Sequence, residues 1–225
     1  MSENYEFNCS TEQQALIYLL VFVILFLVPK FHVLSPQLSL WTDIARYSIL
    51  ALASPFVFRE LYAASLMHWK KSIIKAVFLL LAIYLLVMAA ETIASLPLYL
   101  LSPAYSSLNE NAVSSVLDYL DNKYLWIVVL GILGPITEEI IFRGILVGKL
   151  KQKYPAVLCV IGSSALFAIY HMHAFSTEEF LYYLPTFFGS IVLTIGYLKT
   201  DNFSLCMLWH IMNNLPAVID MCLSA

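Results

Sequence analysis

The sequence predicts an all-α, polytopic integral membrane protein: a helical bundle with about seven transmembrane helices. Hydrophobic residues make up 61% of the 225 positions and charged residues only 12%, whereas a typical soluble domain has about 25% charged residues. The mean hydropathy is +0.81. Long apolar runs recur along the chain, and no Pro-, Gly- or Ser-rich linker divides it. Residues 1–225 are therefore expected to form a single membrane domain.

Seven apolar segments are candidates for membrane helices, because about 20 such residues cross the hydrocarbon core. They lie near residues 14–29, 38–58, 74–101, 124–150, 156–175, 180–198 and 203–223. The stretch between the second and third, RELYAASLMHWKK, is typical of an amphipathic helix at the membrane interface. The acidic leader before the first segment has no basic residue, so that segment is predicted to be a span and not a signal peptide.

The positively charged residues predict the orientation. Eight of the twelve Lys and Arg residues flank the second, fourth and sixth connections, namely Arg59, Lys70, Lys71, Lys75, Lys149, Lys151, Lys153 and Lys199. The other side carries only Lys30 and Lys123. The positive-inside rule then makes the even-numbered connections cytoplasmic, with the N-terminus inside and the C-terminus outside. The short loops favour a multi-pass protein of a bacterial cell membrane.

Net charge and cysteine usage exclude other classes of protein. The net charge is -3 and no basic stripe is present, which argues against nucleic acid as a partner. The four cysteines, Cys9, Cys159, Cys206 and Cys222, show no metal-type spacing. We expect free thiols or packing residues, since buried cysteine behaves as a small hydrophobe.

The fourth apolar segment contains three charged residues, Glu138, Glu139 and Arg143. Each costs roughly 2.5–3.5 kcal/mol at the centre of a membrane helix, so a functional role is the default interpretation. Glu139 and Arg143 are four residues apart and can pair on one helix face. Glu138 lies about 100° around the helix, without this partner. A free carboxylate beside an oriented ion pair suits general-base chemistry. The preceding Gly134-Pro135 is expected to interrupt the helix.

Two later segments carry polar residues at comparable depth. Phe167 and His171 share one face of the fifth segment, and His210 and Asn214 share one face of the seventh, from which Asn213 is expected to turn away. At about 1.5 Å rise per residue, Glu138, both histidines and Asn214 can meet near the middle of the membrane. One shared polar cavity explains these residues better than separate accidents do.

These three motifs, Glu-Glu-x-x-x-Arg, Phe-x-x-x-His and His-x-x-x-Asn, resemble those of the CPBP family. That family groups type II CAAX prenyl endopeptidases with bacteriocin-processing and self-immunity (Abi) proteins, and the resemblance covers residues near 124–217. It implies an intramembrane glutamic endopeptidase in which Glu138 and His171 activate a water. His210 and Asn214 would then stabilise the oxyanion, while Glu139, Arg143 and Phe167 would support the site.

The resemblance implies no metal and no other cofactor. The residues alone leave zinc open, because a glutamate and two histidines are also a zinc ligand set. The expected partners are the bilayer and a membrane-embedded or lipid-anchored peptide or protein.

Two other functions remain open, a non-catalytic self-immunity or scaffolding protein and a proton-relaying transporter. Glu91, in the third segment, is expected either to line the same cavity or to pair with a helix end. Asp43 and Arg46 are three residues apart and are expected to pair with each other.

Overall fold

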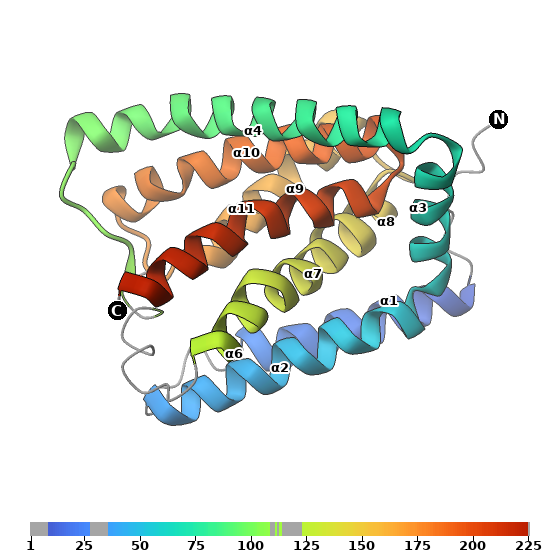
Figure 1. The fold of residues 1–225 in the computed structure, drawn as a ribbon, viewed down its shortest axis with the longest axis horizontal. Helices are drawn as coiled ribbons and strands as arrows, with labels where there is room; N and C mark the ends of the chain where they lie inside the picture. Colours follow the sequence, from blue (N-terminus) through green and yellow to red (C-terminus); the bar gives the residue numbers. More distant parts are fainter. Residues whose placement is uncertain (1–8, 28–35, 109–110, 112, 114–122, 225) are drawn as a thin grey trace.

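The computed structural model describes residues 9–27, 36–108, 111, 113 and 123–224, and the regular structure in these ranges is helical throughout, without a strand (Figure 1). The prediction of an all-α fold is confirmed. The main elements are α1 (Cys9–Phe22) with η1 (Val23–Leu27), α2 (Pro36–Val57), α3 (Arg59–Lys71), α4 (Ile73–Leu101), α9 (Ala156–His171), α10 (Thr177–Thr200) and α11 (Phe203–Ser224). Between α4 and α9 one helix is divided into α6 (Lys123–Val128), η3 (Val129–Leu133), α7 (Gly134–Glu139), η4 (Ile140–Val147) and α8 (Gly148–Leu150).

Three helices in the described ranges are long and apolar enough to cross a membrane: α4, the composite helix Lys123–Leu150 and α10. A fourth span results if α2 and α3, which are bent by 75° at their junction, are taken together. The prediction of seven spans is therefore not confirmed by length and composition. Two of the expected spans, Glu12–Phe26 and Ala156–His171, are shorter apolar helices.

The last helix, α11, shows why fewer helices meet the length and hydropathy criteria than the seven spans predicted from the sequence. α11 has 22 residues, enough to cross the hydrocarbon core. Its middle carries His210, Asn213 and Asn214, which lower its mean hydropathy. The residues that make α11 a candidate for a functional site thus also remove it from the clearly apolar helices.

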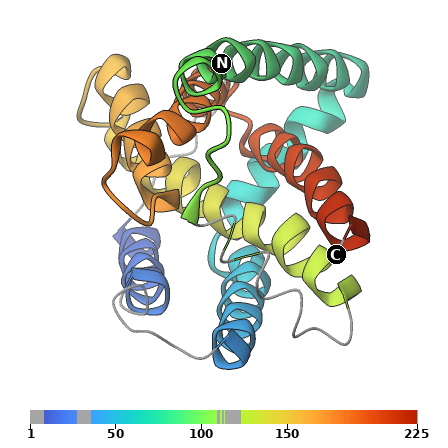
Figure 2. The same ribbon diagram turned by 90° about the vertical axis from the view of Figure 1, so that its left-hand side faces the viewer.

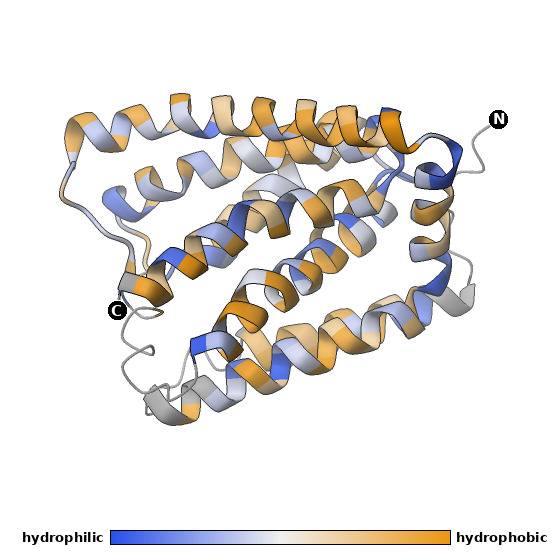
Figure 3. Cartoon of the chain, viewed as in Figure 1, coloured by the Kyte–Doolittle hydropathy of each residue, from blue (hydrophilic) through white to orange (hydrophobic). Residues whose placement is uncertain are grey.

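The composite helix lies at the centre of the bundle and α4 at its edge. In the most apolar part of each helix, 61% of the residues of Lys123–Leu150 are buried but only 22% of those of α4. Figures 1 and 2 show α4 along one side of the molecule, next to α10, and Figure 3 shows its largely hydrophobic surface. Exposed side chains such as Phe78, Leu85 and Ile93 form the kind of surface that lipid covers.

The prediction that Gly134-Pro135 interrupts the helix is wrong. The chain stays helical there, and the wider π-helical turns η3 and η4 flank α7. The Gly134 N–H bonds to the carbonyl of Val129, five residues back. A π-turn takes up the backbone mismatch that proline introduces, so the helix continues. Such turns are frequent at functional sites.

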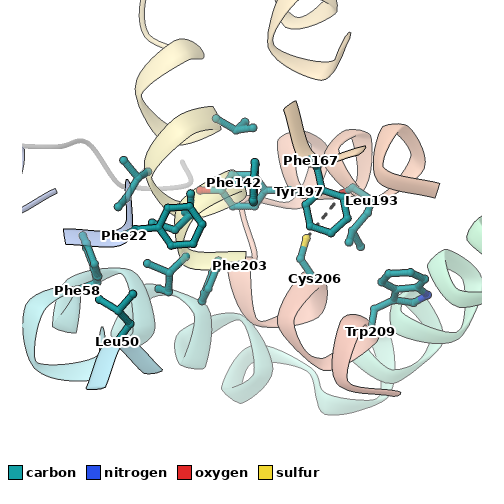
Figure 4. Close-up of a cluster of buried hydrophobic side chains, with 14 of the residues drawn as sticks. Phe22, Leu50, Phe58, Phe142, Phe167, Leu193, Tyr197, Phe203, Cys206 and Trp209 are labelled. Atoms are coloured by element: carbon teal, nitrogen blue, oxygen red, sulfur yellow. Dashed lines mark hydrogen bonds between the residues drawn. The ribbon is translucent and has the colours of Figure 1, made fainter. Parts of the chain in front are cut away.

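A core of aromatic and aliphatic side chains joins the helices (Figure 4). Phe22, Phe142 and Phe167 are buried in it, together with Leu193 and Phe203. Cys159, Cys206 and Cys222 are free and buried, as expected for packing residues, while the side chain of Cys9 lies outside the described part of the chain. Core packing therefore fixes the relative positions of the helices that carry the polar motifs.

Several polar contacts lie at one end of the bundle, where they hold together the second, fourth and sixth connections between the predicted spans. Lys149 pairs with Glu12 at the start of α1. Lys151 Nζ lies 2.5 Å from Asp201 Oδ1, just after α10. The third contact ties α3 to α11, since Trp69 Nε1 donates to Ser204 Oγ at 2.7 Å. In Figure 1 these segments lie at the end that also carries the N-terminus.

Candidate active site

The polar motifs come together where three helical segments meet. Glu138 and Glu139 end α7, His171 ends α9, and His210 lies in α11. All four side chains except that of His171, which is 22% exposed, are buried. A site of this kind needs defined partners, because an unpaired polar group in an apolar interior is costly.

Glu139 and Arg143 form the predicted ion pair, now seen to be completely buried. Arg143 Nη1 lies 2.6 Å from Glu139 Oε1, and neither side chain has exposed area. Arg143 Nη2 donates to Ser190 Oγ on α10 at 2.7 Å, and the guanidinium carbon lies 4.6 Å from the centre of the Phe167 ring. The pair therefore anchors the composite helix to α9 and α10.

Glu138 faces both histidines. Its Oε2 atom lies 3.6 Å from His171 Nε2 and 3.7 Å from His210 Nε2. Both distances exceed a normal hydrogen bond. Within the described residues, this buried oxygen has no hydrogen-bond partner. The Glu138 carboxylate therefore lies between the Nε2 atoms of both histidines without bonding directly to either.

The other ring nitrogen of each histidine is already engaged. His171 Nδ1 lies 2.8 Å from the carbonyl oxygen of Phe167, which can only accept a hydrogen bond. His210 Nδ1 lies 2.9 Å from Glu139 Oε1, also an acceptor when ionised. Both Nδ1 atoms are therefore assigned as donors. In a neutral imidazole, this leaves the Nε2 lone pair directed towards Glu138.

The segment after His171 is held by a third buried carboxylate, that of Glu179. Glu179 Oε2 accepts a hydrogen bond from the hydroxyl of Tyr105 at 2.7 Å, and its Oε1 accepts from the backbone N–H of His173 at 3.3 Å. The hydrogen bond to Glu179 raises the pKa of Tyr105, so the phenol remains a donor. These contacts limit the freedom of the chain beside His171.

A cavity of about 180 Å³ opens beside the cluster. Its lining residues come from α4, the composite helix, α9, α10 and α11; they are Glu91, Glu139, Arg143, Phe167, His171, Thr186, Ser190, Leu193, Trp209, His210, Asn213 and Asn214. Glu138 is not one of them, but both histidines that it faces line the cavity. Asn213 also lines the cavity, so the expectation that it turns away from the site is wrong. Adjacent residues on one helix can both border a broad cavity.

Sequence reasoning missed part of this lining. Ser190 and Thr186 lie on α10, which carries none of the three motifs, and Trp209 lies next to His210 on α11 but is not part of a motif. A buried serine within a glycine-containing membrane helix is a weak signal, since small residues there are common. The Glu91 prediction is better supported, because the structure places this residue at the cavity.

One other prediction concerns the charged side chains of α2. Arg46 pairs with Asp43 as expected and also donates to the carbonyl of Leu25. Among the described residues, no group of three or more His, Cys, Asp or Glu side chains is arranged to hold a metal ion.

A buried carboxylate between two imidazoles, beside a polar cavity in an apolar helical bundle, is the arrangement expected of a membrane-embedded hydrolase. The comparisons agree with this class. The family model "Type II CAAX prenyl endopeptidase Rce1-like" matches residues 120–216. The UPF0177 protein YxdF of Lactococcus lactis subsp. lactis (strain IL1403) is 31% identical over 133 residues, or 58% of this chain and 68% of the relative. No solved structure matches the chain.

The chain therefore belongs to the Rce1-like type II CAAX prenyl endopeptidase family, which confirms the resemblance seen in the three motifs. This is a family of membrane-embedded proteases, and the long apolar helices agree with a place in the membrane. All three motifs lie inside the matched residues.

Proposed function

We propose that the protein is an intramembrane endopeptidase that hydrolyses a peptide bond in a membrane-associated peptide or protein. The observation that carries the proposal is the Glu138 carboxylate, buried and facing the Nε2 atoms of His171 and His210. A water molecule in contact with these groups is deprotonated as it attacks. Its oxygen bonds to the scissile carbonyl carbon, and its proton passes to Glu138 or His171. The same proton then goes to the leaving nitrogen as the C–N bond breaks.

His210 and Asn214 act on the oxygen of the scissile carbonyl. They lie one turn apart on α11, and both line the cavity. The Glu139 carboxylate, in contact with His210 Nδ1, stabilises positive charge on that ring, so Nε2–H can donate to the oxyanion. Donors of this kind are worth about 3–4 kcal/mol each in the transition state. Arg143 and Phe167 hold Glu139 and the histidines in position.

The proposed topology has seven membrane crossings, with the basic end of the bundle in the cytoplasm of a bacterial cell. The shorter helices α1 and α9 cross because they pack against neighbours that are long enough to span. The substrate then belongs to one of the classes that such a site can reach from the bilayer: a prenylated tail, a bacteriocin leader or a signalling peptide. Its scissile bond lies at the depth of the cavity.

The decisive experiment compares membrane peptides from cells that produce the wild type or Glu138→Gln. Glutamine keeps the shape of glutamate but removes its negative charge and basicity. General-base catalysis contributes about 100- to 10,000-fold, so products made by the wild type should fall at least 100-fold. The same assay with strong chelators tests the zinc alternative, and we expect the products to persist.

The matched control is Glu60→Gln, the same substitution at an exposed position of α3. It should leave the peptides unchanged, and both variants must be present in the membrane at wild-type levels. If Glu138→Gln retains full function at normal expression, the protein is not an enzyme of this type, and a non-proteolytic membrane partner replaces the proposal.

A further inference from the structure

Glu91 is a charged residue of the cavity that the proposed catalytic mechanism does not use. It lies in α4, the helix at the edge of the bundle, and lines the same cavity as His171 and His210. The other carboxylate in the lining, Glu139, is already paired with Arg143. Glu91 therefore lies on a different wall of the cavity from Glu139.

In the described part of the chain, Glu91 forms no ion pair. A half-buried carboxylate without a partner is unfavourable inside an apolar bundle. Natural proteins keep such groups mainly where they have a function. The missing partner is therefore expected to come from a molecule that enters the cavity.

Gly189 on α10 provides the space for this carboxylate. A Cβ atom at Gly189 would lie 2.4 Å from Glu91 Oε1 and 2.9 Å from Glu91 Cγ. Only glycine at this position leaves room for the Glu91 side chain against α10. Any larger residue would move the carboxylate, although the rest of α10 could remain in place because Glu91 is flexible.

The charges around the cavity favour a cation. The lining contains two carboxylates, Glu91 and Glu139, and one guanidinium, that of Arg143. Glu138 adds a further carboxylate behind the histidines. These carboxylates outnumber the guanidinium, and the apolar bundle around the cavity strengthens their attraction for a positive group.

We propose that Glu91 binds an organic cation of the substrate peptide, so the enzyme prefers peptides with a positively charged group near the scissile bond. This specificity rests on the proposed function. The cation is the ammonium or guanidinium of a Lys or Arg side chain, or a free α-amino group. The volume of about 180 Å³ corresponds to a few water molecules of about 30 Å³ each, which suits one extended side chain.

The test measures binding to purified protein in detergent, independently of turnover. Three probes separate the sources of the cation: Nα-acetyl-lysine methylamide, norleucine methylamide with a free α-amino group, and uncharged Nα-acetyl-norleucine methylamide. Binding is followed by tryptophan fluorescence, because Trp209 lines the cavity. One of the two cationic probes should bind about tenfold more tightly than the uncharged probe, as expected for one charge-assisted hydrogen bond.

Variants locate this preference on Glu91. In Glu91→Gln the preference should fall to less than twofold. Gly189→Ala should weaken it as well, because the new methyl group displaces the carboxylate without changing the charge. Gly196→Ala is the matched control: it lies on the same helix, and its Cβ would meet Ile83 Cδ1 at 3.0 Å and not Glu91. It should keep the tenfold preference.

Two results would overturn the proposal: equal binding of all three probes by the wild type, or an unchanged preference in Glu91→Gln. Peptidase activity of the wild type is measured in parallel with probe binding. A cation preference in a protein without peptidase activity would remove the proposed function but keep the binding site. Peptidase activity without a cation preference would keep the proposed function but remove the cation-binding site.

Discussion

Glu139 connects the charged groups of the site through a single oxygen atom. Its Oε1 lies 2.6 Å from Arg143 Nη1 and 2.9 Å from His210 Nδ1. Because all three side chains are buried, each charge relies on the others for the stabilisation that water would provide at the surface. Neighbouring glutamates thus have different environments: Glu139 is held by two partners, and Glu138 Oε2 has no hydrogen-bond partner among the described residues.

Glu139→Gln is expected to destabilise the fold as well as reduce activity. Removing one partner of a buried ion pair leaves the Arg143 charge uncompensated, which costs about 3–5 kcal/mol. The melting temperature in detergent should therefore fall well below that of Glu138→Gln. The double variant Glu139→Gln/Arg143→Met removes both charges and should recover part of the loss. If it is no more stable than the single variant, the ion pair is not the source of the effect.

His210→Ala and Asn214→Ala should lower turnover with little effect on substrate binding. An oxyanion donor acts chiefly in the transition state, so its loss reduces kcat more than it raises KM. Each substitution should reduce kcat by about 100- to 1,000-fold. Asn213→Ala is the informative comparison, because this residue also lines the cavity. A larger loss of kcat in Asn213→Ala than in Asn214→Ala would assign the amide donor to Asn213.

At the scale of helices, the lengths of the apolar segments predicted the helix boundaries well. They did not predict which side chains meet between helices. α4 begins at Ile73 and ends at Leu101, one residue from the predicted start and at the predicted end. The i,i+4 rule correctly paired Glu139 with Arg143. It could not show which neighbouring helix supplies Ser190, nor that Asn213 borders the cavity. Those contacts depend on helix packing angles, which the pattern of one helix does not contain.

Close packing between the composite helix and α11 suggests an element-scale test. A Cβ at Gly131 would lie 2.8 Å from Leu215 Cδ1 and 3.4 Å from Leu215 Cα. Gly131→Ala should therefore displace the Leu215 side chain and disturb the packing of α11 beside Asn214. We expect a loss of about 1–3 kcal/mol from overpacking and a lower turnover. Both are measured on purified protein, by thermal unfolding and by product formation.

Gly162→Ala on α9 is the matched control, because nothing lies within 4 Å of its Cβ position. Alanine is a better helix former than glycine by about 0.5–1 kcal/mol, so this variant should be as stable as the wild type or more stable. Equal behaviour of the two variants would show that the contact between Gly131 and Leu215 does not position α11.

Across the whole molecule, polar contacts place the basic connections at a common end. Glu12 binds Lys149, and Asp201 binds Lys151, so acidic residues from the start of α1 and the end of α10 meet the lysines that follow η4. Asp201 has a positive φ of 50°, which lets the chain turn sharply from α10 into α11. The charge pattern that predicted the orientation is thus matched by the three-dimensional arrangement of these segments.

This arrangement predicts which positions a membrane-impermeant maleimide can label in sealed cells. Lys71 and Lys153 are exposed and lie in the basic connections, so Lys71→Cys and Lys153→Cys should be labelled only after permeabilisation. Ala104, exposed beyond the other end of α4, should be labelled as Ala104→Cys in intact cells. The buried native thiols of Cys159, Cys206 and Cys222 give little background, and the variant Cys9→Ala removes the remaining one.

Because α4 separates Lys71 from Ala104, labelling of both from outside would mean that α4 does not cross the membrane. Labelling of Lys71→Cys but not Ala104→Cys would invert the orientation and place the basic end outside.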